Sequence, residues 1–191
     1  MTTGRLEAFT DAVIAIVITI LVLELRMPHE PELAALSDVV PVFLTYVLSF
    51  VYLGIYWNNH HHMMVLTERV NGKILWANLH LLFWLSLVPF TTAWMGETDF
   101  AALPTAVYGV DLLLAAIAYF ILQTAIIAEE GPDSRLRAAL GRDLKGKISP
   151  LLYFAAIPLA FVSPWIALAV YVFVALMWLV PDRRIESAVS E

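Results

Sequence analysis

Two opposite charges stand at the start of a long apolar stretch near the amino terminus. Arg5 and Asp11 lie six positions apart, and between Asp11 and the next charge, Glu24, the only polar side chain is Thr19. A charged side chain at the foot of a membrane helix is costly unless protein or water surrounds it, so such residues are often functional. The pair therefore marks a candidate functional site.

Three consecutive histidines, His60, His61 and His62, form a second candidate group. Neighbouring positions on a helix are turned by about 100° from one another, so at most two of the rings face a common partner. A zinc site on one helix needs ligands three or four positions apart, and we therefore expect no metal site. The plain alternative is a set of interfacial histidines at a helix end. No catalytic constellation occurs beyond these residues, so we expect neither an enzyme nor a cofactor.

Asp111 lies inside another apolar stretch, where a carboxylate without a partner is energetically unfavourable. Two interpretations stand. The side chain is either a relay for protons or cations, or a structural carboxylate with a partner, shallow in the outer half of the membrane. We favour the structural interpretation.

The composition sets the broad class of the protein. Of the 191 residues, 61% are hydrophobic and 15% are charged, and the mean hydropathy is +0.79. A soluble domain of this size has no core large enough to hide so much apolar surface, so we expect an integral membrane protein. The chain has no cysteine, which excludes disulfides. Its net charge of -6 argues against a nucleic-acid partner.

The apolar stretches predict an all-α protein with six transmembrane helices in one domain over residues 1–191. A bilayer core of about 30 Å needs roughly 20 helical residues. The predicted spans are 9–25, 39–56, 74–94, 106–128, 148–162 and 165–180.

Local signals mark several of the helix ends. Ser37 is a candidate N-cap for the second span, and Pro41 is tolerated in its first turn. Gly131 can end the fourth span in a left-handed conformation. The block 148–180 is too long for one span, and Ser163 followed by Pro164 has the pattern of a helix start, so we divide the block there.

The basic residues predict the orientation, because lysine and arginine collect on the cytoplasmic side. With six spans, ten of the 11 basic residues fall on one face and only Arg26 falls on the other. We therefore expect a multi-pass protein of the cell membrane with both termini in the cytoplasm. The ten are Arg5, Arg69, Lys73, Arg135, Arg137, Arg142, Lys145, Lys147, Arg183 and Arg184.

Arg5, Phe9, Thr10 and Asp11 resemble the Arg-x-x-x-Phe-Ser-Asp signature that opens the first helix in the transmembrane protein 175 family, the endolysosomal potassium channels and their prokaryotic relatives. Threonine replaces serine at position 10 and keeps the hydroxyl group. Segments 56–64 and 78–96 resemble the end of the second helix and the third helix of that family. The last three spans resemble it in number, length and orientation only.

The resemblance implies a homotetramer whose pore is lined by the first helix of each subunit, without a filter of the TVGYG kind. Carried over from Asp11, the pore-facing positions are Ile16, Ile20 and Leu23, with Thr19 offering a hydroxyl group beside Ile16. Rings of branched apolar side chains can gate a pore by excluding water. Because this helix is apolar all round, its periodicity alone does not separate a pore face from a packed or lipid-facing one.

The resemblance also implies a hydrogen-bonded network at the cytoplasmic ends of the first three helices. Its candidate members are Arg5, Phe9, Thr10, Asp11, Trp57, His60, His61 and Asn78, with His80 as a further candidate. Such a network would tie the pore helix to its neighbours.

The function implied is a potassium-permeable cation channel, with copies of the same chain, the lipid bilayer and monovalent cations as its partners. The alternative is a proton- or cation-coupled transporter that uses Asp11 and Asp111. Transporters often show internal repeats and broken helices. This chain shows no repeat, and Pro158 is the only proline that we interpret as a break in the middle of a span, so we favour the channel.

Overall fold

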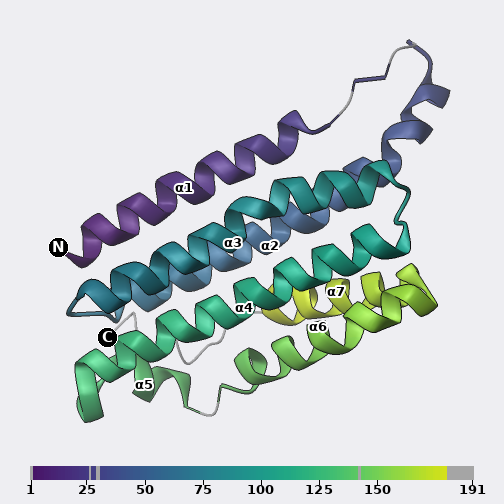
Figure 1. Ribbon diagram of the computed structural model, residues 1–191. Coiled ribbons are helices and arrows are strands. Elements are labelled where there is room, and N and C mark those ends of the chain that lie inside the picture. Colours follow the sequence, from purple (N-terminus) through teal and green to yellow (C-terminus); the bar gives the residue numbers. More distant parts are fainter. Residues whose placement is uncertain (1, 26, 29–30, 142, 180–191) are drawn as a thin grey trace.

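The computed structural model describes residues 2–25, 27–28, 31–141 and 143–179. The described residues form helices joined by short turns (Figure 1), in agreement with the all-α prediction. The α-helices are α1 (Thr3–Leu23), α2 (Val40–Val65), α3 (Gly72–Glu97), α4 (Ala102–Glu130), α5 (Arg135–Leu140), α6 (Leu144–Val162) and α7 (Pro164–Leu179), and two 3₁₀ turns are η1 (Leu33–Val39) and η2 (Gly131–Asp133).

Among the described residues, five helices are long and apolar enough to cross a membrane, namely α1, α2, α3, α4 and α6. Helix α7 is also apolar but has 16 residues, which correspond to about 24 Å against a hydrocarbon core of about 30 Å. The short α5 lies between α4 and α6 and was not among the predicted elements.

The predicted helix ends were partly right. The Ser163–Pro164 division is correct, since Ser163 has extended backbone between α6 and α7. Gly131 ends α4 with the expected positive φ, at 79°, but its ψ of -150° is not that of the left-handed helical conformation. The N-cap prediction was wrong, because Ser37 lies within η1 and the N-cap of α2 is Val39. The 3₁₀ turn runs directly into α2, which leaves no separate cap at Ser37.

Helix α2 continues nine residues beyond the predicted end at 56, to Val65. The predicted span ended before the polar run from Trp57 to His62. These side chains do not stop the helix, because several of them have hydrogen-bond partners on α1 and α3.

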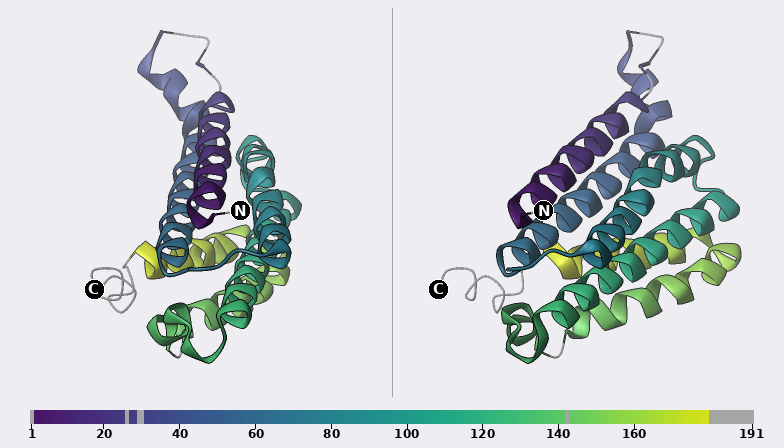
Figure 2. Two further views of the ribbon diagram at one scale, coloured as in Figure 1. Left: turned by 90° about the vertical axis from the view of Figure 1, so that its left-hand side faces the viewer. Right: turned by 60° about the vertical axis from the view of Figure 1, so that its left-hand side comes forward.

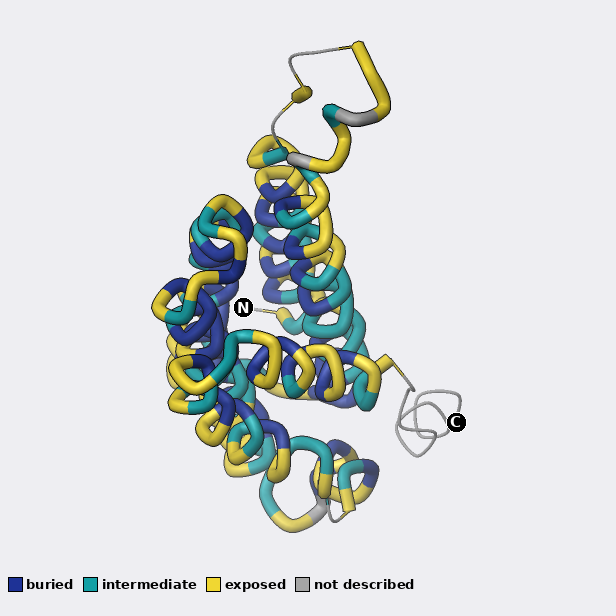
Figure 3. Tube along the Cα trace, turned by 90° about the vertical axis from the view of Figure 1, so that its right-hand side faces the viewer, coloured by how far each residue is buried: buried dark blue, intermediate teal, exposed yellow. Residues whose placement is uncertain are grey.

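The helices stand in a row from α1 at one edge to α6 at the other, and α2 and α7 form a second layer behind α3 and α4 (Figures 1 and 2). Helix α1 packs against α2 and α3, α3 packs against α4, and α4 packs against α6 and α7. One hydrophobic core joins α1, α2 and α3 to part of α4, and a second lies between α2, α4, α6 and α7. Buried positions gather where helices face one another, and exposed ones lie on the outer sides (Figure 3).

The amino terminus of α1, the turn between α2 and α3, and the end of α4 with α5 lie at the same end of the row (Figure 1). This end carries Arg5, Arg69, Lys73, Arg135 and Arg137. Lys145 and Lys147 lie in the first turn of α6. Arg26, Arg142, Arg183 and Arg184 fall outside the described residues.

Candidate functional site

Helix α1 has one covered face and one uncovered face. Its buried residues, Leu6, Thr10, Ile14, Val17 and Leu21, follow helical spacing and pack on α2 and α3. The positions expected to face a pore lie on the other side.

On that uncovered side, Ile16 is 59% exposed, Ile20 38% and Leu23 79%. Steps of about 100° per residue place the three on one face. Thr19 is also exposed, but its hydroxyl group donates to the carbonyl oxygen of Ile16 at 2.7 Å. In this subunit, the described residues therefore leave a branched apolar face of α1 without a partner.

Asn78 of α3 lies at the centre of a buried hydrogen-bonded chain. Its Nδ2 donates to Thr10 Oγ1 of α1 at 2.8 Å, and its Oδ1 lies 2.9 Å from His60 Nε2 of α2. Thr10 in turn donates to the carbonyl oxygen of Leu6 at 3.1 Å. All three linked side chains are buried, so one amide joins three helices.

This geometry assigns the tautomer of His60. The Asn78 Oδ1 atom only accepts hydrogen bonds, so His60 Nε2 carries the proton. In the neutral ring, Nδ1 is then an acceptor, and it is buried without a hydrogen-bond partner among the described residues. His60 is therefore the histidine of the run that faces the interior.

A second set of contacts joins α1 to α2 nearer the surface. Trp57 Nε1 donates to Asp11 Oδ1 at 3.0 Å, and His61 Nδ1 lies 2.6 Å from Glu7 Oε1. The Trp57 and His61 rings stack with centroids 6.5 Å apart. Glu7 was missed by the sequence reasoning, although its position one turn before Asp11 on the same face was the signal that could have found it.

Other candidate residues are not joined to these contacts. Arg5 is exposed, and among the described residues no hydrogen bond or ion pair joins it to Asp11, because six helical positions turn the two side chains about 120° apart. Phe9 is 48% exposed on the uncovered face of α1. His80 accepts a hydrogen bond from Trp84 one turn along α3, at 2.9 Å.

Asp111 lies elsewhere, at the junction of α3 and α4. It is 4% exposed, and its Oδ2 atom lies 3.0 Å from the hydroxyl oxygen of Thr91. The carboxyl group thus has a partner, as the structural interpretation expected.

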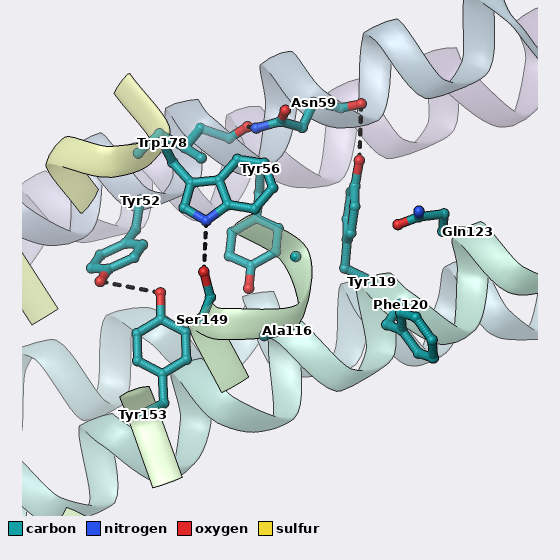
Figure 4. A pocket seen from close by; sticks show the side chains of 12 residues that line it. Tyr52, Tyr56, Asn59, Ala116, Tyr119, Phe120, Gln123, Ser149, Tyr153 and Trp178 are labelled. Atoms are coloured by element: carbon teal, nitrogen blue, oxygen red, sulfur yellow. Dashed lines mark hydrogen bonds between the residues drawn. The ribbon is translucent and has the colours of Figure 1, made fainter. Parts of the chain in front are cut away.

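A small cavity of about 50 Å³ lies between α2, α4, α6 and α7 (Figure 4). Its wall is mostly aromatic and includes Tyr52, Tyr56, Tyr119, Tyr153 and Trp178. Some polar groups of the wall bond to one another, as Tyr153 does to Tyr52 at 3.2 Å, and none of the described residues that line it is charged. The described residues hold no cluster suited to a metal ion.

Comparison with known proteins places the chain in a family. Residues 5–89 match the family described as the endosomal/lysosomal potassium channel TMEM175. The chain is 52% identical over 191 residues, the full length of both proteins, to the potassium channel HX13_20290 of a Chryseobacterium species. It is 31% identical to the potassium channel B446_29190 of Streptomyces collinus, over 92% of this chain and 90% of the relative.

A solved structure agrees with this placement. The crystal structure of a lysosomal potassium-selective channel TMEM175 homolog from Chamaesiphon minutus matches with a TM-score of 0.81 and 30% identity, over 94% of this chain and 97% of the other. The match of fold and sequence over nearly the whole length means that this chain belongs to the TMEM175 family.

Proposed function

We propose that this protein is a potassium-permeable cation channel of the cell membrane, in which four copies surround a pore lined by α1. The observation that carries the proposal is the two-sided character of α1. One face is packed onto α2 and α3, and the opposite face, with Ile16, Ile20 and Leu23, has no partner within the described subunit. The potassium channels among its relatives support the choice of ion.

A single α1 helix cannot enclose a pore, so several copies must surround an axis, and cyclic symmetry closes such a ring. In a fourfold ring, the exposed faces of α1 would converge. Rings of isoleucine and leucine would hold the pore at a width where water enters reluctantly, and small movements of these side chains would open it. Thr19 would add a ring of hydroxyl groups beside Ile16.

The polar contacts would act as the anchor of the pore helix. The hydrogen bonds from α1 to other helices that are described above all start between Glu7 and Asp11. Further along, α1 is held by apolar packing of Ile14, Val17 and Leu21. Apolar contacts lack directional bonds, so the part of α1 that bears the constriction can shift while its amino-terminal turns stay fixed.

In this proposal α7 is the sixth span, and both termini lie in the cytoplasm. The gathering of described basic residues at one end of the row supports this orientation. The shorter α7 would span with the help of local bilayer thinning or of flanking residues.

The transporter alternative rests on Asp111. That carboxyl group is buried between α3 and α4, away from the uncovered face of α1, and it faces the hydroxyl group of Thr91. It therefore offers no open route for an ion, and the channel is the better supported function.

The test is single-channel recording of the purified protein in planar bilayers, paired with its mass in detergent by light scattering. The proposal predicts a tetramer and unitary potassium currents of about 10⁶ ions per second or more, faster than a carrier whose cycle takes microseconds to milliseconds. A monomer that retains activity, or flux only at carrier rates, would contradict it.

A further inference from the structure

Asp111 is a buried carboxyl group that the proposed ion pathway does not use. It lies on α4, nine positions after the helix start at Ala102, and it is 4% exposed. Its Oδ2 atom has one partner, the hydroxyl group of Thr91 on α3. Its Oδ1 atom is buried and has no hydrogen-bond partner among the described residues.

The described side chains around Asp111 offer no compensating charge. The polar group next to it on α3 is the hydroxyl of Thr91, and the titratable groups that interact with it are the phenols of Tyr56 on α2 and Tyr108 on α4. No lysine, arginine or histidine in the described part of the chain interacts with the carboxyl group. An anion at this place would be buried without a counter-charge, which is among the least favourable arrangements inside a membrane.

The hydrogen-bond donors can be counted. Thr91 has one hydroxyl proton, and besides Asp111 the carbonyl oxygens of Val88 and Leu87 lie within 3.2 and 3.4 Å of its Oγ1. If Asp111 were ionised, Thr91 would have to give that proton to Oδ2, and the charged Oδ1 would still have no donor. If Asp111 is protonated, Oδ2–H donates to Thr91 Oγ1, Thr91 donates to Val88, and Oδ1 is a neutral carbonyl oxygen.

A bound cation does not solve the same problem. Hard cations in proteins take about six to eight oxygen ligands, and here one threonine hydroxyl accompanies the carboxyl group. The described residues also contain no group of three acidic, histidine or cysteine side chains that could hold a metal ion. A proton is the ligand that needs only one further oxygen.

We propose that Asp111 is a proton-binding site: the proton converts it to a neutral carboxylic acid that donates to Thr91 Oγ1 and joins α4 to α3. The proton comes from the aqueous phase, and the only bond formed is the O–H bond of the acid. This inference does not depend on which helix lines the pore.

The test is infrared spectroscopy of the purified protein at neutral pH. The difference between the wild-type protein and Asp111→Asn should contain the C=O stretch of a protonated carboxylic acid. Asparagine is neutral and similar in shape, and its amide can still donate to Thr91, so the variant should assemble. A difference in the carboxylate bands alone would overturn the proposal.

A second pair of variants keeps the test valid if Asp111→Asn does not fold. Thr91→Val removes the acceptor of the acid proton and should shift the acid band toward the frequency of an unbonded acid. Thr92→Val is the matched control, because Thr92 is equally buried and bonds to Ser49 at 2.6 Å. An acid band that is unmoved in folded Thr91→Val, or moved as much by Thr92→Val, would contradict the assignment to Asp111.

Discussion

Asn78 uses both ends of one side-chain amide to hold three helices together. Its amide nitrogen donates to Thr10 of α1, and its amide oxygen accepts from His60 of α2. Inside a membrane, water does not replace a lost partner, so each buried polar group that loses its bond carries a penalty. Asn78 is therefore a buried polar link of α1 to both α2 and α3.

Asn78→Leu should destabilise the protein, since leucine has a similar branched shape but leaves His60 Nε2 without its partner and leaves Thr10 Oγ1 with only its bond to the carbonyl oxygen of Leu6. We expect a loss of about 1–3 kcal/mol for each buried group left unsatisfied, measured by thermal or denaturant unfolding in detergent. Ser86→Ala is the control on the same helix, because Ser86 is exposed and bonds only to the carbonyl oxygen of Phe83. Equal stability of Asn78→Leu and wild type would show that the chain of bonds is dispensable.

Substitutions of Arg5 and Asp11 should differ in their effects on stability. The Arg5 side chain is exposed and forms no hydrogen bond or ion pair with a described residue, so Arg5→Ala should change stability by less than about 0.5 kcal/mol. Asp11 accepts from Trp57, and Asp11→Ala should cost about 1 kcal/mol. The same unfolding measurements compare them, and a larger loss in Arg5→Ala would mean that this arginine has a partner in the assembled channel.

At the residue scale, sequence reasoning found much of the polar site. Thr10, Asp11, Trp57, His60, His61 and Asn78 were all proposed, and the structure brings them together in two sets of contacts. It did not separate those two sets or find Glu7, because helix rotation and packing decide which side chains meet. The same limit applied to Arg5, whose spacing from Asp11 suggested a pair that the helix turns apart.

At the scale of elements, the hydrophobic stretches were sufficient to find the long helices but not all of their ends. Helix α2 continued through a polar run because neighbouring helices satisfied its side chains, and that is tertiary information. The start of α2 was predicted to within one residue, but its N-cap was misplaced at Ser37 because η1 joins α2 without an interruption. The break between α6 and α7 was predictable, because proline at a helix start is a local signal.

A close approach of two helices offers a test at this scale. A Cβ atom at Gly109 of α4 would overlap the Tyr171 hydroxyl group of α7, which donates to the carbonyl oxygen of Thr105 at 3.1 Å. Gly109→Ala should therefore push α7 from α4 and cost about 1–3 kcal/mol, measured by thermal unfolding.

Gly54→Ala on α2 is the matched control. A Cβ atom there meets nothing within 4 Å, and alanine favours the helix by roughly 0.5–1 kcal/mol over glycine. Gly54→Ala should thus equal or exceed the wild type in stability. If Gly109→Ala behaved in the same way, the contact between α4 and α7 would be looser than described.

For the whole molecule, the class of protein followed from composition, and membership of a channel family confirms the expectation that it is not an enzyme. The assembly could not be predicted from composition, because an apolar helix has similar side chains toward lipid, pore and protein. The structure shows which face of α1 packs on protein and which face is left for a pore or lipid, because one face is covered and the other is free. The tetramer and the pore-lining role of α1 remain proposals that depend on that free face.

The most direct test of the pore is the conductance of Ile16→Asn. If Ile16 of four subunits faces the axis, the asparagine ring lowers the barrier to water at the constriction. Single-channel recordings should then show a higher conductance and a weaker preference for potassium over sodium. Val17→Asn is the control: Val17 is about 100° away around the helix and 4% exposed, so it should impair packing without producing a more conductive pore. A silent Ile16→Asn in an assembled protein, with permeation altered only by Val17→Asn, would contradict the account.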